Sequence, residues 1–263
     1  MRITQLRNAT VIVELGPHRI LVDPMLAPKD ALPPLKFGGG RARNPTVDLP
    51  PGSADLLDGV THCLITHCQK GHFDHLDRAG TRWLRERGIP VICTPHDADY
   101  LRGRGLNVQA LASSAHAPQA FLDGQATTVP CRHGRGAIGL LMEHGVGYFL
   151  EMPGEPTLYL SGDTLLTPAV SAFIAAHQPD VCLVPAGGAR FDLGGEIIMG
   201  APDVVALLRL AGGQVVANHL EALSHCPVTR AGLSQAAARA GVAERLHVPA
   251  DGEAVAFTLP QQA

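Results

Sequence analysis

The sequence predicts an α/β fold, a four-layer αββα sandwich in which two mixed β-sheets are flanked by helices. Two observations predict it. Short apolar or β-branched runs come first along the chain and then alternate with stretches of helical periodicity. The pattern also divides into two comparable halves, each sufficient for one sheet with helices on one face. Because no linker or break in composition separates the halves, we expect a single domain over residues 1–263.

The first half begins with two short strands, expected at residues 10–14 and 19–23. Gly16-Pro17 separates them and is typical of a hairpin turn. The apolar run 60–65 then predicts a buried strand. The later elements of this half are a helix at 76–87 that ends at Gly88, a strand at 91–93, a short helix at 97–102 and a strand at 108–111.

A long segment rich in proline and glycine, residues 24–53, interrupts the strands of the first half. Loops of this length are mostly functional or disordered. This one carries Lys36, Arg41 and Arg43. We interpret it as a flap on the substrate side, with a passive surface loop as the alternative.

The second half opens with a segment, residues 120–151, that reads as antiparallel strands. Turns are expected within it at Asp123-Gly124 and His144-Gly145. Strands and helices then alternate to the end of the chain. The expected strands are 157–160, 181–184, 215–217 and 254–259, and the expected helices are 168–176, 203–210 and 229–240.

One short run, residues 66–75, carries the most chemistry. It reads Thr-His-Cys-Gln-Lys-Gly-His-Phe-Asp-His and places three imidazoles and one carboxylate directly after the apolar run 60–65. These side chains would therefore sit where a buried strand opens into a loop. Neutral imidazole and carboxylate together suit Zn²⁺ and similar divalent metals. The run predicts a metal site, in which Cys68 is either a further ligand or a residue that only lines the loop.

The composition narrows the class of protein. Hydrophobic residues make up 46% of the chain, enough for a large core, and the net charge of −3 carries no block of one sign. Both this charge and an aromatic content of 4% argue against a nucleic-acid partner. No apolar run approaches the roughly 20 residues of a membrane helix, and the first residues lack a secretory leader. We expect a cytoplasmic protein with six reduced cysteines; a homo-oligomer is compatible with the sequence.

The metal run resembles the signature of the metallo-β-lactamase superfamily, His-x-His-x-Asp-His. His72-Phe73-Asp74-His75 fits its second half, and Lys70 stands where the first histidine belongs. The nearest substitute is His67, which makes Gln69-Lys70-Gly71 an insertion. Two geometries stay open. Either the insertion bulges and His67 reaches the first metal, or His67 is displaced, Lys70 points into the first site and one metal is bound.

The resemblance extends over nearly the whole chain and implies the αββα fold with a two-metal site at the edge between the sheets. It also implies three further ligands, each after an expected strand: His133, Asp163 and His219. One metal would be held by His67, His72 and His133. The other would be held by Asp74, His75 and His219, with Asp163 bridging the two. The implied metal is Zn²⁺, with Mn²⁺ or Fe²⁺ as alternatives.

Residues around the ligands are expected to orient them or to bind substrate. Asp23 ends the strand at 19–23 and resembles a family carboxylate that orients a metal histidine. Glu221 and His225 are expected to contact the metal ligands from outside or to bind the substrate. Arg190 is expected to bind the substrate through its positive charge. Several segments look similar to the branch that contains ascorbate-6-phosphate lactonase: 7–10, 22–25, 43–45 and 219–222.

The resemblance implies a hydrolase in which a metal-activated hydroxide attacks an ester, lactone or phosphoester of a small anionic metabolite. Asp74 and Asp163 are the expected catalytic carboxylates. Five arginines on loops suit an anionic group: Arg41, Arg43, Arg132, Arg135 and Arg190. One alternative is a phosphodiesterase for a nucleotide or lipid. Another is a non-catalytic metal-bound sensor in which Lys70 impairs the first metal position.

Overall fold

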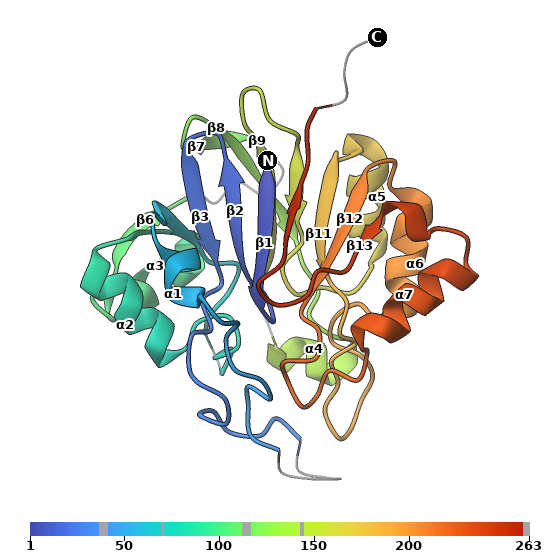
Figure 1. Cartoon of the computed structure of the whole chain (residues 1–263), viewed down its shortest axis with the longest axis horizontal. Coiled ribbons are helices and arrows are strands. Elements are labelled where there is room, and N and C mark those ends of the chain that lie inside the picture. The colour runs from blue at the N-terminus through green and yellow to red at the C-terminus, as the bar shows by residue number, and fades with distance from the viewer. Residues whose placement is uncertain (37–41, 70, 112–116, 143–144, 260–263) are drawn as a thin grey trace.

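The structure is a computed structural model that describes residues 1–36, 42–69, 71–111, 117–142 and 145–259. Within these residues two mixed sheets of seven strands face each other (Figure 1). In spatial order the first sheet contains β14 (Ala254–Ala256), β1 (Arg2–Arg7), β2 (Thr10–Leu15), β3 (His18–Val22), β4 (His62–Leu64), β5 (Pro90–Cys93) and β6 (Asn107–Ala110). The second contains β13 (Leu246–His247), β12 (Gln214–Asn218), β11 (Val181–Pro185), β10 (Leu158–Leu160), β9 (Val146–Glu151), β8 (Gly124–Pro130) and β7 (Gln119–Phe121).

Helices cover the outer sides of both sheets and complete the expected four layers (Figure 1). On the left of the view, the first sheet is covered by α1 (Ser53–Leu57), α2 (Arg78–Arg87) and α3 (Pro95–Arg102). On the right, the second is covered by α5 (Pro168–His177), α6 (Ala201–Leu210) and α7 (Arg230–Arg239), which the 3-10 turn η1 (Ala243–Arg245) follows. In the part of the chain that the structure describes, no helix combines the length and apolarity needed to cross a membrane.

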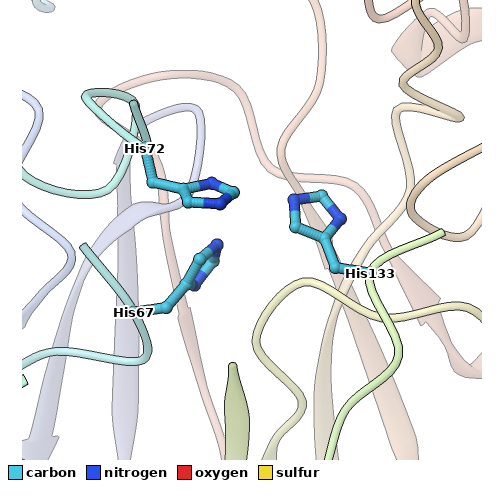
Figure 2. A group of neighbouring side chains, drawn as sticks. All are labelled: His67, His72 and His133. Atoms are coloured by element: carbon cyan, nitrogen blue, oxygen red, sulfur yellow. The ribbon is translucent and has the colours of Figure 1, made fainter. Parts of the chain in front are cut away.

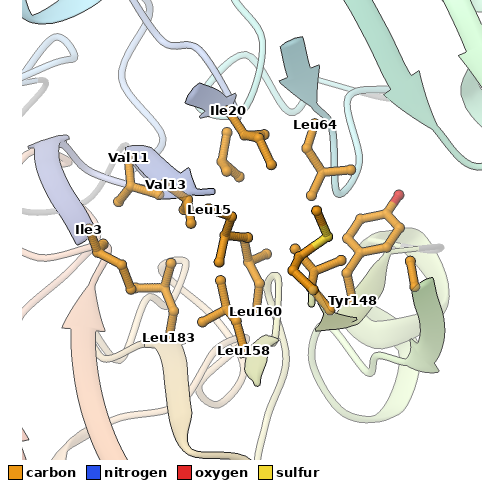
Figure 3. Packing of buried hydrophobic residues seen from close by; sticks show 14 of the residues in the cluster. Ile3, Val11, Val13, Leu15, Ile20, Leu64, Tyr148, Leu158, Leu160 and Leu183 are labelled. Carbon is orange, nitrogen blue, oxygen red and sulfur yellow. The ribbon is translucent and has the colours of Figure 1, made fainter. Parts of the chain in front are cut away.

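The main core lies between the two sheets (Figure 3). Side chains of a strand alternate between its faces, and β2 shows the result. Val11 and Val13 point to the second sheet, whereas Ile12 packs on the outer side with Leu57 of α1. The second sheet repeats the pattern, because Leu183 enters the central core while Cys182 and Val184 pack under the helices. Each sheet therefore has two apolar faces, as a four-layer fold requires.

The carboxyl ends of the strands that precede the expected ligands lie at one edge of the sandwich. Strands β3 to β6 are parallel, and so are β10 to β13. β8 runs in the direction of β10 because the strand between them, β9, is antiparallel to both. The carboxyl ends of such strands lie at the same edge of a sheet, where ligands of α/β proteins bind. The loops after β3, β4, β8, β10 and β12 therefore converge.

The long loop after β3 is fastened at its base by a buried arginine. The Arg7 side chain is fully buried, and its guanidinium donates to the carbonyls of Met25 at 2.7 Å, Ala27 at 2.8 Å and Val47 at 3.1 Å. Further along, Thr46 donates to the carbonyls of Glu221 and Ala222. The loop is thus tied to the segment after β12. Its residues 37–41, including Arg41, lie outside the described residues.

The expected antiparallel region at 120–151 is partly wrong. It contains a helix, α4 (Gly136–Met142), between β8 and β9. Its apolar residues resemble a strand in sequence, but Ile138 and Met142 are four positions apart and pack together on one apolar cluster, as helical spacing allows. The turn at His144 lies outside the described residues. Strands β1 and β13 were not expected, and β14 ends at Ala256, earlier than expected.

Candidate metal centre

The first ligand group consists of His67, His72 and His133. Each offers a ring nitrogen, and these nitrogens lie within 4.8 Å of one another. Figure 2 shows His67 and His72 approaching from one side and His133 from the other, with the three rings directed inward. His67 follows β4 and His133 follows β8, so the group joins the two sheets. All three side chains are buried.

The second group consists of Asp74, His75, Asp163 and His219, whose ligand atoms also lie within 4.8 Å of one another. Oδ2 of Asp163 is 3.1 Å from Nε2 of His75 and 3.3 Å from Nε2 of His219. The same oxygen is 3.6 Å from Nε2 of His133 in the first group. Asp163 therefore lies between the groups, at the place a bridging carboxylate would take.

The histidine rings are oriented by partners at their outer nitrogens. Nδ1 of His75 is 2.9 Å from Oδ2 of Asp23, and Nδ1 of His133 is 2.8 Å from the carbonyl oxygen of Ile197. Asp23 is itself fixed, since it accepts from the backbone N–H of Thr66 at 2.8 Å and from its hydroxyl at 2.6 Å. These contacts turn Nε2 toward the centre, as outer-shell partners of metal histidines do. Asp23 thus contacts His75, one of the histidines that it was expected to orient.

Thr66 and two other partners were not identified from the sequence. The hydroxyl of Thr66 is 3.0 Å from Nδ1 of His67. Nε2 of His72 is 3.1 Å from the carbonyl oxygen of Met142, which leaves its Nδ1 for the centre. Sγ of Cys226 is 3.5 Å from Nδ1 of His219. Thr66 carried a usable signal, because it directly precedes His67. Cys226 lies seven positions after His219, whereas Met142 is 70 positions from His72.

Burial sets the protonation of the first group. It lowers the pKa of His67 well below the usual value and the pKa of His72 to about 4. It also lowers the pKa of His133, although Asp163 opposes the shift. These imidazoles are therefore neutral near pH 7, which is the form that binds metal. Nε2 of His67 is buried and has no hydrogen-bond partner among the described residues.

The second group concentrates negative charge. Burial would raise the pKa of Asp163, but His219 and His75 outweigh it and hold that pKa well below the usual range. Conversely, burial would lower the pKa of His75, yet Asp163 and Asp74 raise it well above the usual value. Buried carboxylates in such proximity require cationic charge. The donor set, the neutral imidazoles of the first group and the demand for positive charge in the second all fit divalent metal ions.

The irregular motif keeps His67 beside the other ligands of the first group. His67 is fully buried and lies in the first ligand group, as the bulged geometry requires. Lys70 lies outside the described residues. Cys68 is a member of neither ligand group, and its side chain packs instead in the apolar cluster beneath α2 with Leu76 and Leu84.

Of the other expected site residues, one lies near the ligand groups and two have other surroundings. His225 is buried, and Asp74 and His219 influence its charge, so it lies near the centre. Glu221 binds Arg230 instead, with 2.6 Å between its Oε2 and Nη1 of the arginine. Arg190 is exposed on the segment that follows β11.

Among the described loop arginines, Arg43, Arg132 and Arg135 have surroundings other than the ligand groups. Arg43 donates to the carbonyls of Asp30 and Ala31. Arg132 and Arg135 line a hollow of about 390 Å³ beside the start of α5, and none of its lining residues belongs to a ligand group.

Comparison with known proteins decides the family. The model of the family described as "Beta-lactamase superfamily domain" matches residues 18–220. The chain belongs to the beta-lactamase superfamily. It is 32% identical over 262 residues to the UPF0173 protein YddR of Bacillus subtilis, covering 98% of this chain and 100% of that one. It is 31% identical to a UPF0173 metal-dependent hydrolase of Azorhizobium caulinodans, covering 74% of this chain and 77% of the relative.

Solved structures agree with this assignment to the superfamily. An isothiocyanate hydrolase from Delia radicum gut bacteria superposes with a TM-score of 0.87 at 31% identity, covering 98% of this chain and 100% of the other. A protein from Veillonella parvula described as a possible metal-dependent hydrolase gives the same TM-score at 27% identity, with 98% and 99% covered. The expected fold is confirmed, and the chain is a metal-dependent hydrolase. The lactonase branch stays a prediction.

Proposed function

We propose that the chain hydrolyses a small molecule at a centre of two divalent metals, most naturally Zn²⁺. His67, His72 and His133 would hold one, and Asp74, His75 and His219 the other, with Asp163 shared. The observation that supports this most is the convergence of two separate ligand groups, each with its donor atoms within 4.8 Å. Imidazole and carboxylate donors also accept Mn²⁺ and Fe²⁺, so the proposal covers these metals.

The chemistry follows from the donors. Metal ions bound here would lower the pKa of a nearby water toward about 7. The protein's own carboxylates then direct the reaction. Asp163 lies between the groups and offsets positive charge on both sides. Asp74 is buried, and its Oδ2 is 3.4 Å from Nε2 of His219; we assign it the role of orienting the attacking water and accepting its proton.

The proposed bond is an ester, a lactone or a phosphoester of a small metabolite, which an attacking hydroxide cleaves at carbon or phosphorus. An anionic substrate remains part of this proposal. The described arginines give it limited support, because Arg43 is bound to backbone carbonyls and Arg132 and Arg135 line a separate hollow.

Hydrolysis of an isothiocyanate is a second candidate, which the 31% identical isothiocyanate hydrolase favours because the two chains match over almost their full lengths. In this reaction the oxygen of water bonds to the central carbon of R–N=C=S. The carbon–nitrogen bond breaks, both protons of the water end on nitrogen, and the products are the amine R–NH₂ and carbonyl sulfide. The electrophile is again a carbon that a hydroxide attacks, so the same carboxylates serve.

The experiment is metal analysis of reconstituted protein combined with a substrate panel of lactones, simple esters, phosphodiesters and isothiocyanates. We expect about two equivalents of metal and turnover of carbon electrophiles that chelation abolishes and metal restores. Less than about half an equivalent of metal after reconstitution would contradict the proposal. Turnover of phosphodiesters alone would assign the chain to the phosphodiesterase alternative, and bound metal without turnover to the sensor.

A further inference from the structure

His225 is a buried histidine beside the ligand groups that belongs to neither of them. Its side chain is 4% exposed, and the carboxylates of Asp74 and Asp163 act on its charge. Nδ1 of the ring is buried and has no hydrogen-bond partner among the described residues. A buried polar atom without a partner is costly, so this nitrogen is suited to a group that arrives with the substrate.

An apolar wall extends from His225 toward the first ligand group. The ring of His225 stacks on Phe191, with 5.9 Å between ring centroids and an interplanar angle of 20°. Phe191 packs on the same apolar cluster as Ile138 and Met142 of α4. The carbonyl of Met142 in turn contacts His72. The wall therefore connects the first ligand group with the unpaired Nδ1 of His225.

Beyond the wall, large apolar side chains are exposed to solvent. Leu140 and Leu141 of α4 are 82% and 74% exposed, and Leu193 of the neighbouring loop is 83% exposed. The two segments touch, since a Cβ added at Gly194 would lie 2.1 Å from Cδ1 of Ile138. α4 contains no charged residue. Large exposed apolar side chains on two touching segments are suited to bind an apolar group.

We propose that this surface is the substrate subsite of the hydrolase. Nδ1 of His225 forms a hydrogen bond with a polar atom next to the reacting carbon, while Phe191, Leu141 and Leu193 contact an alkyl or aryl arm. The inference rests on the proposed function and refines it, because it selects a neutral substrate with an apolar arm over a small anion. The loop carries one charged residue of each sign next to Phe191, namely Arg190 and Asp192.

The test uses metal-loaded protein and compares substrate probes whose alkyl or aryl arm increases in length. The probes are p-nitrophenyl acetate, butyrate and hexanoate, and methyl, butyl and benzyl isothiocyanate, each series with one member whose arm ends in a carboxylate. In the wild type, kcat/KM is expected to rise about three- to fourfold for each methylene group that becomes buried, and the carboxylate is expected to remove the gain. Phe191→Ala, and Leu141→Asp combined with Leu193→Asp, should flatten the series through KM.

Two variants of His225 separate its nitrogen from its ring. His225→Phe keeps an aromatic ring on Phe191 and removes the nitrogen, so kcat/KM should fall about tenfold for every arm while the dependence on arm length stays. His225→Asn places an amide near the position of Nδ1 and should recover most of the loss. Leu259→Asp is the control, because Leu259 is an exposed leucine close to the C-terminal end of the described chain; it should leave the series unchanged.

Several outcomes would overturn the inference. One is a dependence on arm length that survives both Phe191→Ala and the double aspartate variant. Another is a wild-type dimer that the aspartates dissociate without altering the series, since the surface would then belong to a second copy of the chain. If the wild type hydrolyses neither these probes nor the substrate panel described above, the proposed function fails, and calorimetry with benzyl alcohol judges the subsite alone. Binding to the wild type but not to Phe191→Ala supports it, and absence of binding to both overturns it.

Discussion

The thiol of Cys226 is the partner of His219, with 3.5 Å between Sγ and Nδ1. The other outer nitrogens described above contact oxygen: a hydroxyl for His67, a carboxylate for His75 and carbonyls for His72 and His133. Sulfur is a weak hydrogen-bond partner. His219 is therefore held by the weakest partner of the five, and the second ligand group depends on this contact for the orientation of one of its imidazoles.

Replacing Cys226 should consequently weaken metal binding. Cys226→Ala removes the partner of Nδ1, and loss of such outer contacts typically costs 10–100-fold in metal affinity. We expect a loss of about tenfold for the more weakly bound metal, measured by competition with a chromophoric chelator. Cys226→Ser keeps a polar atom at the position and serves as the matched control. Wild-type affinity in the alanine variant would show that Cys226 only fills space.

Asp163→Asn should abolish most of the activity while the fold is kept. The change removes a negative charge that is shared between the groups and retains the shape of the side chain. Loss of an electrostatic catalytic group of this kind costs at least ~100-fold in turnover. The measurement is kcat on whichever probe the wild type hydrolyses, with metal content determined in parallel. Turnover at the wild-type level would rule out the bridging position.

His67→Ala tests the irregular motif through metal stoichiometry. The first group offers three imidazoles, and removing one leaves too few ligands for tight binding. We expect the metal content of reconstituted protein to fall from about two equivalents toward one. A wild type with a single metal that His67→Ala does not change would instead support the displaced geometry with Lys70 in the first site. Elemental analysis distinguishes the two.

Gly80→Ala should destabilise the protein because α2 approaches the backbone after β3 closely. A Cβ at Gly80 would lie 2.0 Å from the carbonyl oxygen of Pro24, directly after Asp23. Overpacking of this kind costs about 1–3 kcal/mol or more, to be measured by chemical denaturation. Gly195→Ala is the control, since its Cβ would have no neighbour within 4 Å. Equal stability of the two variants would contradict the close approach.

All six cysteines should be reduced. The structure shows each of them free: Cys63, Cys68, Cys93, Cys131, Cys182 and Cys226. Burial raises the pKa of the Cys182 thiol to about 12, which keeps it protonated and unreactive. Titration of denatured, unreduced protein with a thiol reagent should find close to six thiols per chain. A substoichiometric count in freshly purified protein would reveal a bridge.

Local patterns predicted most of the fold. Strands such as β2 and β11 are apolar runs, and α2 begins at Asp77, whose side chain accepts from the N–H of Gly80, and ends at Gly88. β1 was missed because its sequence is largely polar. Gln5 and Arg7 are nevertheless buried, since backbone carbonyls accept their hydrogen bonds, that of Asn8 for Gln5 and that of the more distant Met25 for Arg7. A local sequence pattern does not indicate such hydrogen-bond partners.

In the candidate site, too, the local sequence indicated some residues and not others. The ligand residues were found because imidazole and carboxylate side chains at strand ends carry their chemistry in the sequence itself. What orients them was mostly not found, because the partners are backbone carbonyls or residues of other segments. Ile197 is 64 positions from His133. The helix α4, which supplies the carbonyl that contacts His72, was itself read as strand.

The two ligand groups draw on both halves of the sandwich: His67 and His75 follow the first sheet, and His133, Asp163 and His219 follow the second. A bound metal would therefore act as a cross-link between the two sheets, in addition to the apolar core and to hydrogen bonds such as the one that Tyr148 donates to the carbonyl of Ile65. Its binding free energy becomes folding free energy, about 2.7 kcal/mol when free metal is at 100 times its Kd. Metal starvation would then lower activity in two ways. It removes the ions needed for catalysis, and it enlarges the unfolded fraction that is exposed to proteolysis.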